Sequence, residues 1–172
     1  MAKGTKRATN AGDLAVMIDD VEELADIIAC LKEEGKVVVF TNGTFDLLHV
    51  GHIRCLKDAR SRGDYLVVAV NSDASVRKYK NPKLPIQKFE ERKEIIAALR
   101  WVDYVIGFED ATCDELIAAL KPSIVAKGTD YTEDSVPERE TIASVGASIA
   151  IVGDPKDHAS SKLIQRIRRL KF

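Results

Sequence analysis

Short apolar runs alternate with amphipathic helical patterns along most of the chain, and this alternation constrains the fold more than any other feature. The runs typical of buried strands fall at 37–40, 65–70, 104–108, 123–126 and 148–152. The helical patterns lie between Asp20 and Gly35 and near 50–62, 89–99, 112–120 and 159–169. Strands that alternate with helices form parallel sheets covered on both faces. We therefore predict an α/β fold, a Rossmann-like doubly wound sandwich with a parallel sheet of about five strands.

The length of 172 residues allows one domain with a sizeable core and is short for two. Residues 1–10 are polar and basic, and residues 1–18 show little periodicity, so we expect a flexible lead-in over 1–18 followed by a single catalytic domain over 19–172. The three cysteines are far apart and lack metal-type spacing. They are predicted to be buried free thiols, in neither a disulfide framework nor a zinc site.

The charge balance argues against two classes of partner. A formal net charge of -1 gives no overall field that would hold a polyanion, so we expect neither nucleic acid nor a membrane surface as the main partner. No apolar run approaches the ~18 residues of a membrane span. The sequence therefore favours a soluble, cytoplasmic protein.

The stretch TNGTFDLLHVGH at 41–52 follows the first predicted strand and holds two of the three histidines in the chain. His49 and His52 stand three residues apart where a helix begins, so both can project from one face. Gly51 between them allows the backbone to approach an oxyanion closely. Doubly wound sheets bind ligands beyond the carboxyl ends of their strands, and helix N-termini favour anions. We interpret the pair as phosphate-binding donors, although an isolated pair at a helix start is more often without function.

Other features of the sequence have more than one interpretation. Asp46 is a candidate outer group for a metal ion or a cap of its turn. Segment 78–88 contains two prolines and four lysines, which predicts a mobile basic loop beside the site or an ordinary solvated surface. His158 lies in a different segment from the histidine pair, so no metal site is predicted.

The stretch GTFDLLHVGH at 43–52 resembles the HxGH cytidylyltransferase-like nucleotidyltransferases. Further blocks follow in family order, and the resemblance covers roughly residues 36–167. These blocks are NSDASVR at 71–77, ERK at 91–93, DYVIGFE at 103–109, KGTDY at 127–131 and SSKLI at 160–164. Within the family, the chain most resembles the adenylyltransferases that act on heptose 1-phosphate for lipopolysaccharide.

The resemblance implies roles for matching residues. As catalytic residues it implies His49, His52, Lys80 and Arg92. As nucleotide-binding residues it implies Gly43, Thr44, Phe45, Gly51, Lys78, Lys127, Ser160 and Ser161. The basic residues at 78, 80 and 92 would hold the triphosphate or the substrate phosphate. The residues themselves leave other readings open, because loop lysines are usually solvated and Arg92 can pair with Glu90 or Glu91 on its own helix.

The expected reaction is an in-line transfer of AMP from ATP to a sugar 1-phosphate, with release of pyrophosphate. Mg²⁺ is expected from the chemistry, and a homodimer is implied by the resemblance. The sequence departs from the heptose enzymes at Asn81, at Leu84 and in the altered block at 154–161. At Arg100 it resembles the sequence pattern of the glycerol 3-phosphate cytidylyltransferases instead. A CTP-dependent enzyme for an alcohol phosphate and a non-catalytic nucleotide-binding module are the alternatives. A dehydrogenase is disfavoured because no G-x-G-x-x-G follows the first strand.

Overall fold

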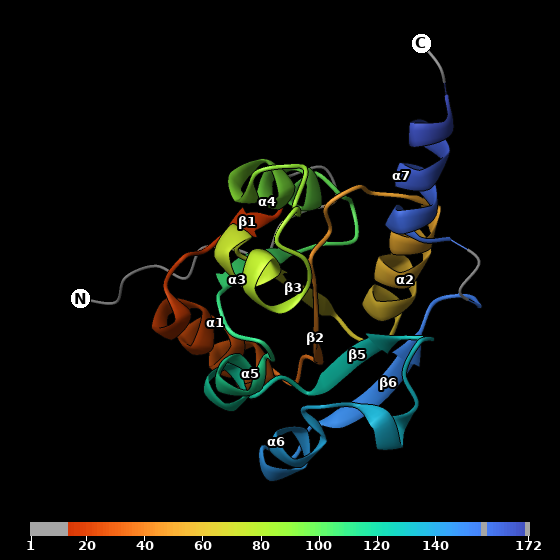
Figure 1. Cartoon of the computed structure of the whole chain (residues 1–172). Helices are drawn as coiled ribbons and strands as arrows, with labels where there is room; N and C mark the ends of the chain where they lie inside the picture. Colours follow the sequence, from red (N-terminus) through yellow and green to blue (C-terminus); the bar gives the residue numbers. More distant parts are fainter. Residues whose placement is uncertain (1–13, 156–157, 171–172) are drawn as a thin grey trace.

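The computed structural model describes residues 14–155 and 158–170, and a six-stranded parallel sheet forms its centre (Figure 1). The strands are β1 (Val16–Met17), β2 (Val38–Gly43), β3 (Tyr65–Asn71), β4 (Tyr104–Phe108), β5 (Ile124–Gly128) and β6 (Ser148–Val152). The helices are α1 (Val21–Glu33), α2 (Val50–Ser61), α3 (Asp73–Tyr79), α4 (Phe89–Ala97), α5 (Asp114–Leu120), α6 (Arg139–Ser144) and α7 (Ser160–Arg169), with a 3₁₀ turn at Glu133–Ser135. This architecture confirms the predicted α/β class.

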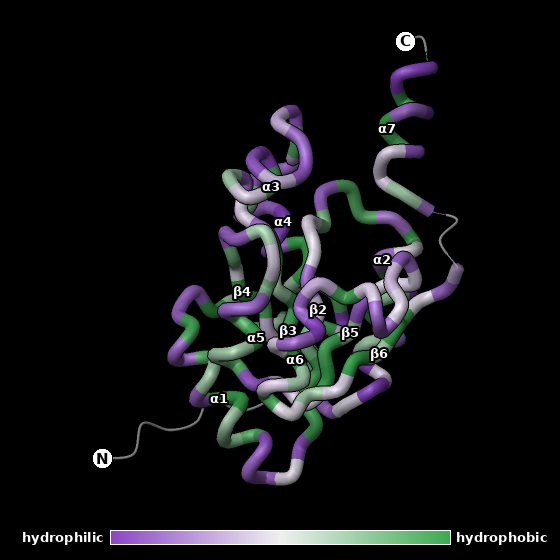
Figure 2. Tube along the Cα trace, turned by 60° about the horizontal axis from the view of Figure 1, so that its bottom comes forward, coloured by the Kyte–Doolittle hydropathy of each residue, from purple (hydrophilic) through white to green (hydrophobic). Residues whose placement is uncertain are grey.

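Successive strand residues alternate between two apolar layers, one on each face of the sheet. Phe40 packs with residues of α1, α5 and α6, whereas its neighbour Val39 packs with residues of α2 and α4. Figure 2 shows the hydrophobic strand segments gathered in the middle of the molecule. Burial on both faces explains why the strands read as continuous apolar runs in the sequence. Helix α7 buries none of its side chains and extends away from the sheet on the side of α2 (Figures 1 and 2).

The strand order β1-β4-β3-β2-β5-β6 reverses its direction of growth at β2. The chain proceeds from β2 to β3 on one side and later returns to place β5 on the other side. In doubly wound sheets, ligands bind at the carboxyl edge beside such a reversal. Thr41 Oγ1 donates a hydrogen bond of 2.9 Å to the carbonyl oxygen of Ala126, which ties the carboxyl ends of β2 and β5 together. The fold therefore places residues 42–46 and 127–131 at one site.

The sequence pattern missed one strand and two short helices. Val16 and Met17 pair with Tyr104 and Val105 to form edge strand β1, although they fall within the expected lead-in 1–18. Residues 1–13 of that lead-in lie outside the described residues. A two-residue strand is too short to show periodicity. Helices α3 and α6, of seven and six residues, are similarly below the length at which a helical period is distinct.

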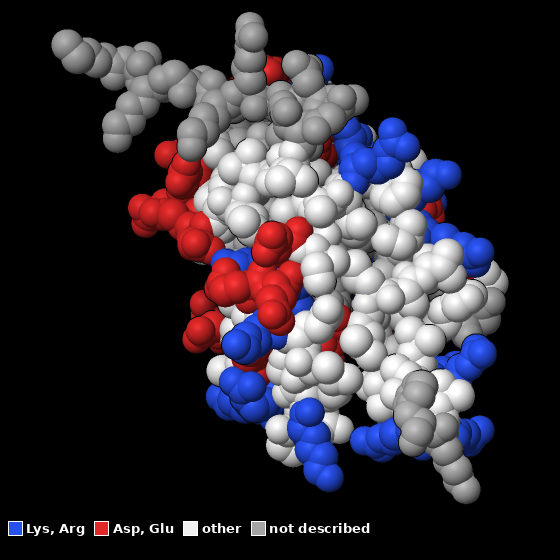
Figure 3. Space-filling view, turned by 90° about the horizontal axis from the view of Figure 1, so that it is seen from above, with Lys and Arg blue, Asp and Glu red and all other residues white. Residues whose placement is uncertain are grey.

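On the face seen in Figure 3, acidic side chains gather on the left of the view, and basic side chains lie below them and along the right side, with uncharged surface between the two sides. Of the cysteines, Cys113 is buried and Cys55 is partly buried, but Cys30 is exposed on α1, contrary to expectation. Within residues 14–155 and 158–170, no helix has the length and apolar character needed to cross a membrane.

Candidate active site

The turn after β2 directs the chain into α2 and sets the position of both histidines. Phe45 adopts a left-handed backbone conformation, with φ of 49°, and is buried. A Cβ atom on Gly43 would lie 3.0 Å from the Phe45 ring, so a larger residue there would press on this ring. The Phe45 ring also meets the His52 ring edge-on, with centroids 5.6 Å apart. The turn thus fixes His52 by direct contact.

His49 and His52 stack at the start of α2, with ring centroids 3.9 Å apart. The backbone N–H of His49 donates a hydrogen bond of 3.3 Å to Nδ1 of His52. Nδ1 therefore acts as an acceptor, and a neutral His52 ring carries its hydrogen on Nε2. Burial, together with the smaller effect of the neighbouring His49, lowers the pKa of His52 to about 4. At neutral pH, His52 is thus an uncharged hydrogen-bond donor.

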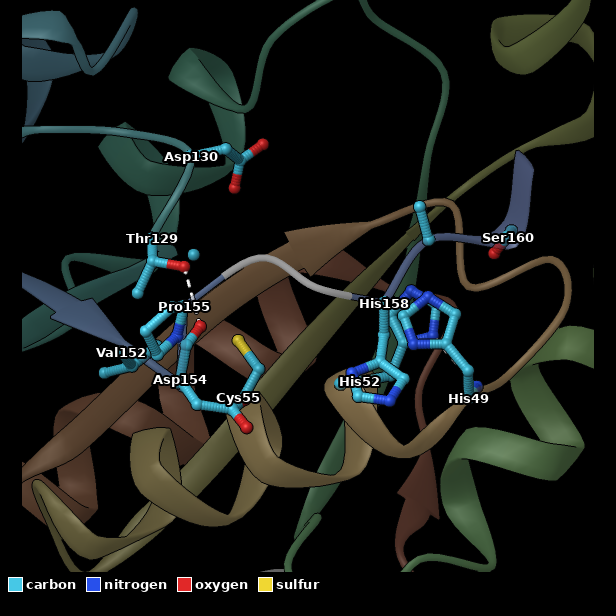
Figure 4. Close-up of a pocket in the computed structure, with 14 residues that line it drawn as sticks. His49, His52, Cys55, Thr129, Asp130, Val152, Asp154, Pro155, His158 and Ser160 are labelled. Carbon is cyan, nitrogen blue, oxygen red and sulfur yellow. Dashed lines mark hydrogen bonds between the residues drawn. The ribbon is translucent and has the colours of Figure 1, made fainter. Parts of the chain in front are cut away.

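The first pocket has a volume of about 330 Å³ and lies between the start of α2, the segments that follow β5 and β6, and the start of α7. Figure 4 shows the histidine rings at one end and Cys55, Thr129, Asp154 and Pro155 at the other. Thr129 Oγ1 donates a hydrogen bond of 2.8 Å to the carbonyl oxygen of Asp154. The Asp154 carboxylate forms an ion pair with Arg54 of α2. These contacts hold the wall of the pocket that is opposite the histidines.

All three histidines of the chain meet in this pocket, which the sequence did not indicate. The ring of His158 lies parallel to that of His49 at a centroid distance of 6.3 Å. A Cβ atom on Gly51 would lie 3.0 Å from Nδ1 of His49 and 3.3 Å from Cβ of His158. Gly51 therefore makes room for imidazole groups as well as for a ligand. Burial lowers the pKa of His49, and His158 adds to this effect.

A second pocket, of about 260 Å³, adjoins the first at the carboxyl ends of β2 and β5. Its polar lining includes Thr44, Lys80 and Lys127. His52 and Asp130 line both pockets, so His52 lies at the junction between them. Two lysine ammonium groups thus line the second pocket, and three imidazole rings line the first.

Asn71 at the end of β3 orients Lys80. Its Oδ1 accepts a hydrogen bond of 3.2 Å from the Lys80 ammonium, which also donates to Thr44 Oγ1. Removal of the ammonium from water lowers the pKa of Lys80, and the positive charges of Arg92 and Lys127 also lower it. The motif NSDASVR thus contains a group that directs a lysine toward the turn after β2.

Arg92 is placed differently from the expectation that it holds a phosphate. Its side chain is fully buried, and its guanidinium donates to the carbonyl oxygens of Thr44, Asn71 and Gln87. It also forms an ion pair of 2.8 Å with Asp73 of α3, and not with a glutamate of its own helix. Arg92 therefore holds the backbone of Thr44, which lines the second pocket, but its own side chain does not line that pocket.

Segment 78–88 is more structured than the expected mobile loop. Lys78 and Tyr79 belong to α3. The backbone N–H groups of Ile86 and Gln87 donate hydrogen bonds of 2.8–2.9 Å to the carboxylate of Asp46. Asp46 is buried, and these donors to its carboxylate come from segment 78–88 and not from its own turn. Its carboxylate attaches segment 78–88 to the turn after β2.

The remaining expected residues are divided between lining and surface positions. Gly43, Thr44, Phe45 and Lys127 line the second pocket, whereas Gly51 and Ser160 line the first. Ser160 Oγ donates a hydrogen bond of 2.9 Å to the carbonyl oxygen of Leu47. Lys78 and Ser161 are exposed and line neither pocket. In the described part of the chain, no group of three or more His, Cys, Asp or Glu side chains is placed to hold a metal ion.

Comparisons with known proteins agree with this geometry. A family model described as cytidylyltransferase-like matches residues 40–167. A protein named bifunctional protein HldE from Geobacter sulfurreducens is 45% identical over 91% of this chain, and its namesake from Pelobacter propionicus is 47% identical over 87%. The chain spans only 32% and 31% of the lengths of these two relatives.

Two solved structures share the fold. A lipopolysaccharide core biosynthesis protein from Thermoplasma volcanium superposes with a TM-score of 0.62 at 30% identity, covering 71% of this chain and all of its own. A pantoate-beta-alanine ligase from Francisella tularensis has the same TM-score at 18% identity, covering 91% of this chain and 74% of its own. The second likeness concerns the fold alone.

Substitution of Arg92 by lysine should destabilise the protein. Lysine lacks the planar fork that reaches several acceptors, so buried carbonyl oxygens would lose their partners. We expect Arg92→Lys to lower the free energy of unfolding by about 2 kcal/mol or more in denaturant titrations. The exposed Arg100→Lys is the matched control and should be neutral. A loss equal to that of the control would show that the buried contacts of Arg92 do not support the fold.

The pKa of His52 should make stability depend on pH in a defined window. Folding lowers this pKa from 6.5 to about 4, so between these values the unfolded chain binds more protons than the folded chain. The free energy of unfolding contributed by His52 is therefore complete above pH 6.5 and is lost as the pH falls toward 4. An NMR titration should follow His52 directly, and His52→Gln should reduce the pH slope of stability. A titration midpoint near 6.5 would contradict the burial argument.

Proposed function

Because this chain belongs to the cytidylyltransferase-like family, we propose that it transfers AMP from ATP to heptose 1-phosphate, forming an ADP-sugar and releasing pyrophosphate. The observation that carries the proposal is the position of His52, a neutral donor at the junction of two pockets. Transfer between two bound phosphates needs such a junction. The choice of heptose is supported by the sequence blocks that resemble heptose 1-phosphate adenylyltransferases and by the similarity to a lipopolysaccharide core biosynthesis protein.

The nucleoside is assigned to the first pocket. Its volume of about 330 Å³ is near the lower end of the range for small-molecule sites. The start of α7 contributes to the lining, and free backbone N–H groups at a helix start favour phosphate oxygens. His49 and His52 at the start of α2 would face the same phosphates. The triphosphate would thus lie between two helix N-termini, with its α-phosphorus near His52.

The sugar 1-phosphate is assigned to the second pocket. Lys80, at the end of α3, and Lys127, on β5, both line it and would neutralise the acceptor phosphate. Thr44 and Asn42 offer uncharged polar groups to the same ligand. The phosphate of an acceptor placed there would lie beside Lys80 and Lys127, on the far side of His52 from the first pocket. This direction suits an in-line displacement.

In the proposed reaction, a phosphate oxygen of the acceptor attacks the α-phosphorus of ATP. The new bond joins this oxygen to phosphorus, and the bond from phosphorus to the pyrophosphate oxygen breaks. No side chain becomes covalently attached, so the protein contributes position and charge. Nε2–H of His52 would donate to the α-phosphate oxygens as their charge rises, and a preorganised donor of this kind typically contributes ~10²-fold in rate.

Mg²⁺ fits this reaction as an ion carried by the substrate. The Asp46 carboxylate is occupied by backbone N–H groups and that of Asp154 by Arg54, so neither is a ready ligand. Mg²⁺ commonly binds through phosphates and water with few protein ligands, and when bound it would neutralise phosphate charge. A homodimer and a cytoplasmic location remain predictions from the sequence.

A substrate panel tests the proposal. Pyrophosphate release should be fastest with ATP and heptose 1-phosphate when ATP and CTP are each combined with heptose 1-phosphate and glycerol 3-phosphate. In competition at equal concentrations, a preference for ATP of ~10²-fold in kcat/KM is expected, because a pocket built for one base leaves groups unpaired with the other. Predominant transfer of CMP to glycerol 3-phosphate would replace this function with that of a cytidylyltransferase.

The same assay tests the role of His52. His52→Ala should lower kcat by ~10²-fold or more, whereas Lys57→Ala, an exposed change on the same helix, should leave it unaltered. The thermal midpoints of both variants control for folding. Near-normal turnover by a folded His52→Ala protein would remove His52 from the catalytic mechanism.

A further inference from the structure

A buried ion pair adjoins the second pocket. The Lys127 ammonium lies 2.8 Å from Oε2 of Glu138, and the side chains are only 6% and 3% exposed. Lys127 also donates a hydrogen bond of 2.8 Å to Oδ1 of Asn42. The other carboxylate oxygen, Oε1 of Glu138, accepts a hydrogen bond of 3.3 Å from the backbone N–H of Cys113. The Glu138 carboxylate thus connects the start of α5 with a lysine that lines the pocket.

Glu138 itself does not line either pocket, so any effect on a ligand must pass through Lys127. The Lys127 ammonium forms an ion pair with the Glu138 carboxylate and donates a hydrogen bond to Oδ1 of Asn42. These two contacts fix where the ammonium lies at the edge of the pocket. Glu138 thus influences the geometry of the pocket without touching its contents.

The electrostatic setting makes a counter-ion necessary. Lys80 lines the same pocket, and the Arg92 guanidinium lies beneath it. A third cation buried nearby without a negative partner would carry a large desolvation cost, in addition to repulsion from these two charges. Exposed ion pairs, such as that of Arg139 with Asp134, remain in contact with water, which solvates their charges. Lys127 depends on Glu138 instead.

We propose that Glu138 is a positioning residue for the acceptor: its carboxylate pairs with the Lys127 ammonium and holds it at the second pocket, where it binds the phosphate of the sugar 1-phosphate. The identity of the acceptor rests on the proposed function, whereas the coupling between Glu138 and Lys127 does not. The proposed phosphate site therefore includes Glu138, the N-cap residue of α6, which lines neither pocket.

Steady-state kinetics of Glu138→Gln test this role. Glutamine keeps the shape of the side chain and an oxygen for the Cys113 N–H, but it removes the charge. We expect the KM for heptose 1-phosphate to rise ~10-fold while the KM for ATP stays within ~2-fold, because one charge-assisted contact is weakened at the acceptor alone. Glu140→Gln, an exposed change on the same helix, is the matched control and should alter neither constant. Equal rises in both KM values would indicate a general structural defect and overturn the proposal.

A double-mutant cycle then tests whether Glu138 acts through Lys127. Lys127→Met should itself raise the acceptor KM, and adding Glu138→Gln to it should change that KM by less than ~2-fold, since the group that Glu138 positions is gone. Full additivity of the two effects would overturn the proposal. If Glu138→Gln fails to fold, Glu138→Asp retains the charge on a shorter arm, and its acceptor KM should lie between those of the wild type and Lys127→Met. A wild-type KM for this variant would count against the proposal.

Binding of inorganic phosphate separates this proposal from the proposed function. Calorimetry on the nucleotide-free protein should show weaker phosphate binding in both Glu138→Gln and Lys127→Met than in the wild type. If this difference appears and the wild type does not use heptose 1-phosphate, the function fails and the positioning role stands. If phosphate binds all three proteins equally, the positioning role fails whichever acceptor is used.

Discussion

The buried guanidinium of Arg92 is the contact on which the second pocket depends. It bonds to the turn after β2 through Thr44, to the end of β3 through Asn71 and to α3 through Asp73. These segments leave the sheet at neighbouring strands and make few backbone hydrogen bonds with one another, so their spacing must come from a side chain. A planar group with several fixed donors can set that spacing, whereas a flexible ammonium cannot. The approach of Lys80 to Thr44 follows from this arrangement.

From that fixed turn, the geometry extends to the histidines. Phe45 adopts its left-handed conformation between Thr44, which Arg92 holds, and Asp46, which attaches segment 78–88. The Phe45 ring contacts His52, and the His49 N–H selects the His52 tautomer. Each step is a short-range contact, yet together they connect a buried cation to a donor at the junction of two pockets. In this arrangement His52, the proposed catalytic histidine, is oriented by Phe45, which lines the second pocket, and by the backbone of His49.

The sequence predicted the sheet well because each central strand is buried on both faces, and this leaves an apolar run that needs no tertiary information. It predicted Arg92 poorly because FEERK at 89–93 has the composition of a solvated helix face, and only the packing of α4 against β3 and β4 buries Arg92 and Lys93. His158 was also missed as a site residue. Its contact with His49 joins segments more than a hundred positions apart, and it depends on strand order, which periodicity does not encode. Glu138 gave no signal in the sequence, since its partner Lys127 lies on β5, whereas Glu138 precedes α6.

The two pockets of the site differ in the charge of their polar side chains. In the first pocket, burial favours the neutral forms of His49 and His52, so these histidines add no charge that would need a counter-ion. At the second pocket, Arg92 is paired with Asp73 and Lys127 with Glu138. An apolar pair in place of Lys127 and Glu138 would be at least as stable in many proteins, so stability alone does not account for the ion pair. The proposed role of Lys127 accounts for it, because a cation that is to bind a phosphate has to be in place before the ligand arrives.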